Sequence, residues 1–234
     1  MSKVYLIPNM LQEDAVDSIP SMILEKLKYC QVIFAENERT VRRYLKKLDP
    51  GFNIDLYEWH AIEKESDRHE SFFKAALREK KNIAIVSEAG CPGIADPGQS
   101  LVRIAHESDC IVHPLTGPIS PMLALMASGM NGQHFEFVGY LPIDDAARAR
   151  QIKELEAESA RKNSTKIFIE TPYRNNRLLE ALLQHCAGST RLCIASCLTG
   201  QSEKIISKPV SWWKDHKTDL HKQPAIFLIY AGKN

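Results

Sequence analysis

Short, almost continuous apolar runs alternate with amphipathic segments along the first half of the chain. The apolar runs are residues 4–7, 32–35, 83–87 and 111–114. A strand without polar alternation is buried on both faces, as in a parallel sheet that helices cover on both sides. The clearest segments with helical periodicity between them are residues 38–48, 68–80 and 99–107. This alternation predicts an α/β fold with a mostly parallel N-terminal sheet.

The segment 114–121, PLTGPISP, is the densest cluster of helix and strand breakers in the chain. Such a segment fits neither a helix interior nor a central strand. We therefore expect an N-terminal α/β domain over residues 1–115 and a C-terminal α/β domain over residues 116–234. Strands expected at 192–197, 204–207 and 225–231 follow one another with little helix between them, so the second sheet is expected to be mixed.

The charge of the chain is nearly balanced, with 30 Lys and Arg against 29 Asp and Glu, for a net charge of +1. This excludes a globally basic nucleic-acid binder but leaves room for a local basic patch. No apolar run reaches the roughly 20 residues of a membrane span. The N-terminal apolar run is too short for a signal peptide, so a cytoplasmic protein is expected. The six cysteines show no C-x-x-C or zinc-finger spacing, and no metal site is predicted.

The most informative loop reads S-E-A-G-C-P-G-I-A-D-P-G over residues 87–98, directly after an apolar run. Ligands of open α/β sheets bind beyond the carboxyl ends of the strands, and small residues there expose the main chain. A second loop rich in glycine and proline, at 116–121, follows the next strand. The two loops predict two walls of one ligand site. Neither carries a G-x-x-x-x-G-K-[ST] or G-x-G-x-x-G pattern, which argues against a nucleoside triphosphate or a Rossmann dinucleotide.

Three further segments bring together side chains of chemical interest. Residues 170–174, E-T-P-Y-R, end an apolar strand with an acid, a hydroxyl, a phenol and a guanidinium. Residues 137–142, F-V-G-Y-L-P, form a strand end that can line one side of a binding site for an adenine ring. The basic run 39–47 places Arg39 and Arg43 on one helical face, where they can contact phosphates. Each segment also has an ordinary interpretation, as a helix cap, a strand end or a solvated helix face.

Together these motifs resemble the tetrapyrrole methylase superfamily of S-adenosylmethionine (SAM)-dependent enzymes. The nearest branch is that of ribosomal RNA small subunit methyltransferase I. The loop S-D-A-G-T-P-G-I-S-D-P-G of that branch is matched at residues 87–98, and the family's P-G-P-S-A loop at 116–120. The motifs F-x-G-F-L-P, Y-E-S-P-H-R and A-E-D-T-R are matched at residues 137–142, 169–174 and 35–39. The matches run in order over almost the whole chain.

The resemblance implies two α/β domains with SAM in the cleft between them, usually in a homodimer. Carried over position by position, it assigns cofactor binding to Gly90, Cys91, Pro92, Ile94, Ala95, Ser120, Pro121, Leu141, Thr171, Pro224 and Ala225. Most of these side chains are small or apolar. Main-chain groups and the shape of the loops are therefore expected to do most of the binding.

The resemblance also implies methyl transfer to a ribose 2′-hydroxyl of small-subunit ribosomal RNA. Such a hydroxyl must lose a proton, so a base assists the reaction. The candidate catalytic residues are the motif acids Glu36, Glu88, Asp96 and Glu170, and the sequence does not select one of them. The candidate substrate-binding residues are Arg39, Arg43, Tyr173 and Arg174, because guanidinium groups bind phosphate in a bidentate manner.

The chain departs from the family pattern at three places. Residues 7–14 lack both glycines of the T-P-I-G-N-L-G-D loop, and residues 196–200 read S-C-L-T-G instead of R-E-L-T-K. After the F-x-G-F-L-P motif, residues 143–146 read I-D-D-A where the RNA-methylating branch has a basic run. Asp144 and Asp145 are expected to repel RNA phosphates there.

Three classes of function therefore stay open at this point. The first is an RNA 2′-O-methyltransferase that acts on ribosomal RNA or the small ribosomal subunit. The second is a SAM-dependent methylase of a small molecule such as a tetrapyrrole. The third is a SAM-binding protein without catalysis. A basic stripe formed by Arg39, Arg43, Arg148, Arg150 or Arg174 would favour RNA.

Overall fold

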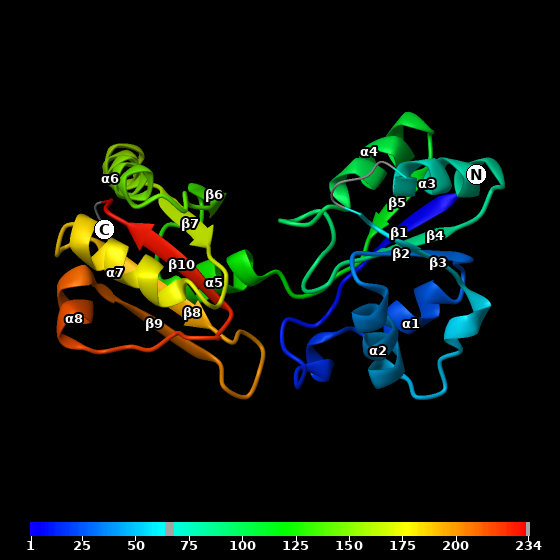
Figure 1. The fold of residues 1–234 in the computed structure, drawn as a ribbon, viewed down its shortest axis with the longest axis horizontal. Helices are drawn as coiled ribbons and strands as arrows, with labels where there is room; N and C mark the ends of the chain where they lie inside the picture. The colour runs from blue at the N-terminus through cyan, green and yellow to red at the C-terminus, as the bar shows by residue number, and fades with distance from the viewer. Residues whose placement is uncertain (64–67, 233–234) are drawn as a thin grey trace. The chain divides into compact units, whose positions relative to one another are not determined.

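The computed structural model describes residues 1–63 and 68–232. The chain folds into two compact units, Met1–Ile119 and Ser120–Asn234. The boundary lies within the breaker-rich segment 114–121, a few residues after the expected one. Each unit contains one five-stranded sheet, so the α/β fold with a parallel first sheet and a mixed second sheet is confirmed (Figure 1).

The sheet of the first unit is entirely parallel, with the order β3-β2-β4-β1-β5. Its strands are β1 (Lys3–Ile7), β2 (Val32–Ala35), β3 (Glu58–Ala61), β4 (Ile83–Val86) and β5 (Ile111–Pro114). Every residue of β2 and β4 is buried, which explains the continuous apolar runs in the sequence. The edge strand β3, with sequence EWHA, has no such run and was not expected from the sequence.

Helices cover both faces of this sheet (Figure 1). Helices α1 (Met22–Leu27) and α2 (Glu38–Leu48) pack on the face that carries Ile33, Ala84 and Val86. Helices α3 (Arg68–Arg78) and α4 (Gln99–Glu107) pack on the opposite face, against Phe34 and Ile85. Because successive strand residues point to opposite faces, the same buried strands feed two separate cores. Short 3-10 helices lie at Val16–Ser18 and Ile54–Leu56.

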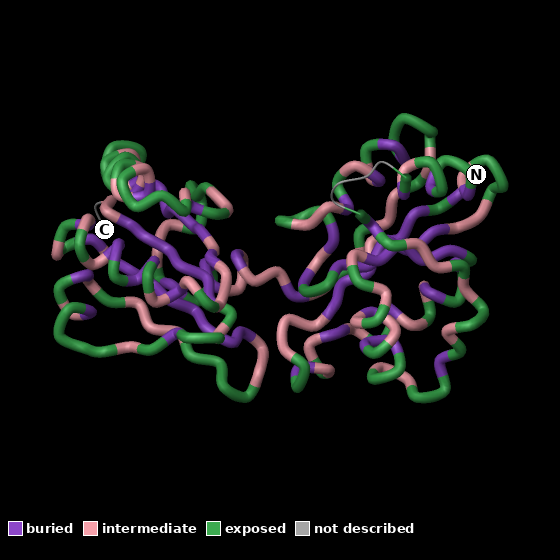
Figure 2. Tube along the Cα trace, in the orientation of Figure 1, coloured by how far each residue is buried: buried purple, intermediate pink, exposed green. Residues whose placement is uncertain are grey.

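The sheet of the second unit has the order β6-β7-β10-β8-β9. Its strands are β6 (Phe135–Tyr140), β7 (Thr165–Ile169), β8 (Arg191–Ser196), β9 (Lys204–Pro209) and β10 (Ala225–Tyr230). Only β6 and β7 pair in parallel, while β10 is antiparallel to β7 and β8, and β9 is antiparallel to β8. Figure 2 shows the buried segments following the central strands in both units.

Four helices complete the second unit, namely α5 (Ser120–Ser128), α6 (Asp145–Lys162), α7 (Asn175–His185) and α8 (Val210–Asp215). Helices α6, α7 and α8 share one core with the strands, built on large side chains such as Phe168, Phe227 and Trp213. Helix α5 packs against β8, β9 and β10. No helix within residues 1–63 and 68–232 is both long and apolar enough to cross a membrane.

A glycine bulge ends strand β6. The register with β7 shifts between Phe137 and Gly139, and Gly139 adopts a φ of +78°. A bulge of this kind inserts one extra residue and bends its strand, and glycine takes the left-handed backbone conformation without steric cost. The bulge therefore sets the direction in which the F-V-G-Y-L-P segment leaves the sheet.

A fully buried lysine links α6 to the second sheet. The side chain of Lys166 on β7 is 1% exposed, and its Nζ donates to Glu158 of α6 at 2.7 Å and to Glu136 of β6. Lys162, one turn beyond Glu158, donates to the same carboxylate. Hydrogen bonds from Lys162 and Lys166 lower the pKa of Glu158 to about 2. The network fixes the position of α6 over β6 and β7.

The Lys166→Ala variant is expected to lose about 2 kcal/mol or more of unfolding free energy, because it removes a buried aliphatic stem and leaves a cavity. Lys162→Ala removes the exposed partner of the same carboxylate and is expected to cost less than about 1 kcal/mol. Urea unfolding followed by circular dichroism measures both. Equal losses for the two variants would contradict the structural role assigned to Lys166.

Candidate active site

The loop that follows β1 is joined to the loop that follows β4 through Asn9. Main-chain N–H groups of Asn9 and Gly90 donate to each other's carbonyl oxygens, at 2.8 and 3.1 Å. Asn9 is 2% exposed, and its side-chain Nδ2 donates to the carbonyl oxygens of Ser87 and Glu88. The Ser87 hydroxyl donates to the Gly90 carbonyl at 2.6 Å. These bonds satisfy buried polar groups and hold the start of the 87–98 loop in one conformation.

The loop after β5 packs against both of these loops at Gly117. A Cβ atom on Gly117 would lie 2.1 Å from Cβ of Pro8 and 3.4 Å from Sγ of Cys91. The Cys91 thiol donates to the Pro118 carbonyl at 3.7 Å. The loops after three neighbouring strands, β4, β1 and β5, are thus packed together at the carboxyl edge of the first sheet, where α/β proteins bind ligands.

The rest of the 87–98 loop is shaped by backbone conformations that few residues adopt. Gly90 and Gly93 have φ values of +74° and +83°, and Ala95, which carries a side chain, has a φ of +54°. The Oδ1 atom of Asp96 accepts hydrogen bonds from the N–H groups of Gly93 and Gly98, at 3.1 and 2.7 Å. Asp96 therefore maintains the turn, and the strained residue lies beside it.

The predicted cofactor residues of the first unit all lie on this loop. Gly90 and Pro92 are buried, Cys91 is half-buried, and Ile94 and Ala95 are exposed. The remaining ones belong to the second unit. There Ser120 and Pro121 open α5, Leu141 is buried after β6, Thr171 follows β7, and Pro224 and Ala225 lead into β10.

A pocket of about 180 Å³ lies beside this loop within the first unit. It is lined by Arg43, Tyr44 and other residues of α2, by the loop after β1, and by Glu88 and Ala89. The Tyr44 hydroxyl donates to the Pro8 carbonyl at 2.7 Å, and Lys47 donates to the Glu13 carbonyl. Since a pocket that encloses a whole drug-sized ligand measures roughly 300–1,000 Å³, this one suits a smaller group.

The other predicted side chains of this unit lie near the pocket in sequence but do not line it. Arg39 is exposed at the first turn of α2, and Glu36 is half-buried directly after β2. Arg42, between the two predicted arginines, pairs with Glu38 at 3.1 Å and stacks over Trp59. The structure therefore brings Arg43 and Glu88 together at the pocket.

In the second unit, Glu170 binds Arg174. The Glu170 side chain is 4% exposed, and its Oε1 accepts from Nη2 of Arg174 at 2.6 Å, from Nε at 3.0 Å, and from the N–H of Thr171. Nε of Arg174 also donates to the Thr171 hydroxyl. This carboxylate thus orients a guanidinium, while Tyr173 between them is 72% exposed.

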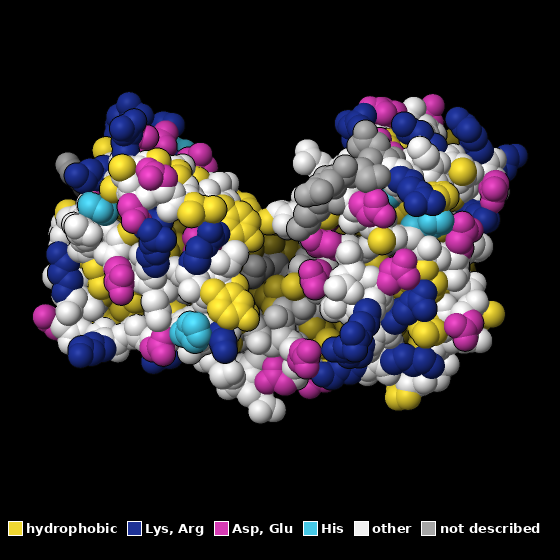
Figure 3. Space-filling view, in the orientation of Figure 1, with side chains coloured by type: hydrophobic (Ala, Val, Ile, Leu, Met, Phe, Trp, Pro, Cys, Tyr) yellow, Lys and Arg dark blue, Asp and Glu magenta, His cyan; other side chains and the backbone are white. Residues whose placement is uncertain are grey.

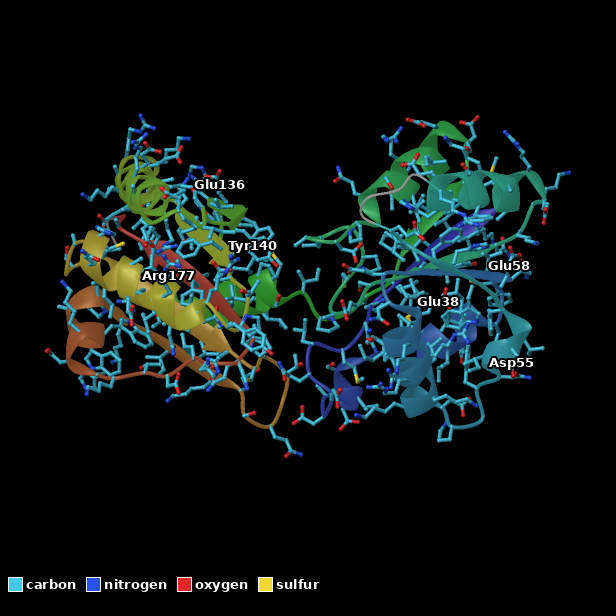
Figure 4. All side chains as sticks on the ribbon, viewed as in Figure 1. Glu38, Asp55, Glu58, Glu136, Tyr140 and Arg177 are labelled. Atoms are coloured by element: carbon cyan, nitrogen blue, oxygen red, sulfur yellow. The ribbon has the colours of Figure 1, made fainter. Side chains whose placement is uncertain are left out.

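The two acids after β6, which were expected to repel RNA phosphates, have structural partners within the second unit. The Asp144 carboxylate caps α6 by accepting from the N–H of Ala147 at 2.8 Å. Asp145 binds Arg148 and also, at 2.6 Å, Arg177 of α7, which Figure 4 labels. The hydrogen bond from Arg177 lowers the pKa of Asp145, with a further contribution from Arg148. Asp145 is therefore paired with cations of the unit, while Asp144 serves as a helix cap.

Arg148, one of the five arginines that could form a basic stripe, is buried and cannot contribute to one. Its side chain is 7% exposed, and its Nη1 donates to the Ile143 carbonyl at 3.0 Å. Figure 3 shows basic and acidic side chains interspersed on the visible face of each unit. Of the five arginines that were considered, Arg39, Arg43 and Arg150 are exposed, and Arg174 is partly exposed.

Comparison with known proteins identifies the fold and the family. The model of the tetrapyrrole (corrin/porphyrin) methylases matches residues 16–211, which is most of the chain. The chain belongs to this family. It is accordingly a methyltransferase. Among solved structures, the methyltransferase CobJ aligns with a TM-score of 0.63 at 16% identity, covering 98% of this chain and 94% of CobJ. Uroporphyrin-III-C-methyltransferase from Thermus thermophilus gives a TM-score of 0.55 at 17% identity, covering 99% and 95%.

Curated relatives in the family are more similar in sequence than these structures. Ribosomal RNA small subunit methyltransferase I of Escherichia coli O157:H7 is 33% identical, over 98% of this chain and 78% of its own length. The protein of the same name from Bacillus subtilis (strain 168) is 32% identical, over 90% of this chain and 68% of its own length. The two structures, both under 20% identical, bear on the fold of this tetrapyrrole methylase alone.

Two residues of this methylase site have roles that were not expected from the sequence. Asn9 drew no attention because only the lost glycines of its loop were noted, yet a buried asparagine directly after an apolar strand is a signal of a bridging side chain. Gly117 was expected as part of the second loop of the site, but not as the residue at which that loop packs on Pro8. Its close approach to Pro8 depends on atoms far apart in sequence, which no local pattern reveals.

Gly117→Ala is expected to separate the packed loops, because the added methyl group would overlap Pro8. The variant should lower the melting temperature and weaken cofactor binding at least tenfold. Gly132→Ala is the matched control, since a Cβ there meets nothing within 4 Å. Differential scanning fluorimetry and calorimetric titration with SAM measure the two effects. A Gly117→Ala protein that binds SAM like the Gly132→Ala protein would refute the packing argument.

Proposed function

We propose that this methylase uses SAM to methylate a ribose 2′-hydroxyl of small-subunit ribosomal RNA. The proposal is supported by relatives named ribosomal RNA small subunit methyltransferase I, which align at about one third identity over nearly the whole chain. The solved methyltransferase structures have only about half this sequence identity to the chain, at 16% and 17%. The same proposal includes a homodimer, which the resemblance implies, and a cytoplasmic location, which was expected from the short N-terminal apolar run.

The packed loops of the first unit support the assignment of SAM as the cofactor. The 87–98 loop has small side chains, and a Cβ on Gly93 would meet nothing within 4 Å, so a ligand can approach the main chain there. Gly90, Cys91, Pro92, Ile94 and Ala95 would hold SAM, and the motifs add Ser120, Pro121, Leu141, Thr171, Pro224 and Ala225 from the second unit. When bound, SAM supplies a methyl group that its sulfonium already activates. The protein then mainly positions the acceptor.

The pocket beside α2 supports an acceptor role for Arg43 and Glu88. Arg43 can bind a phosphate of the acceptor strand, and Arg39 can extend this contact along the exposed face of α2. Glu88 lines the same pocket from the start of the cofactor loop. We assign Glu88 as the base that accepts the hydroxyl proton, because Asp96 and Glu170 are already engaged as hydrogen-bond acceptors within the loops.

A small-molecule acceptor is the second candidate function. It is favoured by the net charge of +1 and by the interspersed surface charges, since a polyanionic substrate usually meets a basic field. The family, which is named for tetrapyrrole methylases, includes this kind of acceptor. A SAM-binding protein without catalysis is the third.

Radiolabelled SAM distinguishes these candidates when it is incubated with the protein and, in separate reactions, with small ribosomal subunits and with uroporphyrin-III. Label in the ribosomal RNA, found in a 2′-O-methylated nucleoside after digestion, is the expected result. Label in the tetrapyrrole alone would replace the proposal by the second function. Micromolar SAM binding by calorimetry without transfer to either acceptor would replace it by the third.

Variants of Glu88 and Asp96 separate a base from a structural acid. Glu88→Gln is expected to reduce the transfer rate about 100-fold or more, as the loss of a general base does, with SAM affinity retained. Asp96→Asn keeps an Oδ1 acceptor for the two N–H groups, and should retain activity within a few-fold. Single-turnover methylation at saturating SAM measures both rates. A larger loss of transfer rate in Asp96→Asn than in Glu88→Gln would instead assign the role of base to Asp96.

A further inference from the structure

An exposed aromatic ring stands at the end of β7, directly beyond Glu170 and Thr171. Tyr173 is 72% exposed, one of the largest exposures among the bulky apolar residues described. Its ring meets the His221 ring edge-on, with centroids 6.0 Å apart and planes at 75°. A tyrosine buries much of its ring when it serves the core. This one is instead presented to solvent at the strand end where the motif residues lie.

The loop that carries His221 is pinned to the same strand end. The N–H of Lys222 donates to the Pro172 carbonyl at 3.1 Å. The Nδ2 group of Asn175, a residue with no exposed surface, donates to the Gln223 carbonyl at 2.6 Å. Asn176 accepts from the N–H of Leu220 and donates to Asp219. Hydrogen bonds thus hold the backbone segments that carry both aromatic rings, which lowers the entropy cost of ordering these segments on binding.

The backbone beside the rings is strained. Lys222 has a φ of +60°, in the left-handed region that residues with a side chain rarely adopt. Strain of this kind persists where the surrounding structure enforces it, and it clusters at functional sites. Here the main-chain bond from Lys222 to Pro172 holds this conformation, and Lys222, which is exposed, directly follows His221 in the chain.

Two cationic side chains belong to the segments that carry the rings. Lys222 is exposed, and the Arg174 side chain is 33% exposed while Glu170 pairs with it. The second acid, Asp219, accepts from Asn176 and from the N–H of His221, and these bonds lower its pKa. The patch therefore combines exposed ring surface with two cations and two acids, and both acids are engaged in hydrogen bonds.

We propose that the Tyr173 ring, contacted edge-on by His221, forms a stacking platform for an unpaired base of the acceptor RNA, with Lys222 and Arg174 contacting its phosphates. Aromatic faces next to cations are how proteins bind single-stranded nucleic acid, since each base offers a π-face and each nucleotide a charge. This inference rests on the proposed RNA acceptor and names part of its binding surface. It adds His221 and Lys222, which no sequence motif marked.

Tyr173→Ala is expected to weaken binding of a short single-stranded RNA by about 5- to 150-fold, the range for loss of one base–aromatic stack. Tyr173→Phe keeps the ring and should restore affinity to within about twofold. Tyr29→Ala, at a tyrosine 58% exposed in the first unit, is the matched control and should bind like the unmodified protein. Fluorescence of a 2-aminopurine in the RNA reports stacking directly, and calorimetry with SAM checks the cofactor site.

Lys222→Gln separates phosphate contact from a purely structural role. The loss of one contact should reduce the slope of log affinity against log salt by about 0.7, the value for single strands. RNA binding by Tyr173→Ala equal to that of the Tyr29→Ala control would overturn the platform, even where methyl transfer to ribosomal RNA is observed. Absence of RNA binding and of RNA methylation by the unmodified protein would instead overturn the proposed function, and the platform with it.

Discussion

The two-residue main-chain bridge between Asn9 and Gly90 is the constraint on which the candidate site depends. Parallel strands are not joined by hairpins at their carboxyl ends, so the loops there need contacts with one another to adopt fixed positions. Here the Asn9 amide, buried and saturated by the Ser87 and Glu88 carbonyls, supplies that link. Gly117 then brings the third loop close, because its missing side chain leaves room for Pro8.

Much of the architecture could be predicted because deeply buried elements have recognisable local sequence patterns. The fully buried strands β2 and β4 appear as unbroken apolar runs, and α2 and α4 have the bounds that their hydrophobic periodicity predicts. The edge strand β3 was not predicted, because a partly exposed strand does not require an unbroken apolar run. The other edge strand, β5, was found from its apolar run although it is only partly buried, so the expectation that this run is buried on both faces was wrong.

The candidate site was only partly predictable, because the identity of a residue does not reveal its partner. The loop at 87–98 was located from its glycines and prolines, but the sequence treated its acids as equivalent. The structure separates them, with Asp96 bound to main-chain N–H groups and Glu88 at the pocket. Likewise the sequence suggested only repulsion of phosphates for Asp144 and Asp145, whereas one caps a helix and the other pairs with two arginines.

The cysteines differ sharply in how far the fold protects them. Burial raises the pKa of Cys30, Cys186 and Cys193 to about 12, so almost none of these thiols ionises at neutral pH. Cys197 is buried as well. Cys91 and Cys110 are only half-buried, although burial also raises the pKa of each of these thiols. A maleimide dye at mildly alkaline pH would therefore attach preferentially at these two more accessible positions. With Cys110 replaced by serine, Cys91 becomes a single native handle for an optical reporter placed inside the loop that the methyl donor is proposed to occupy.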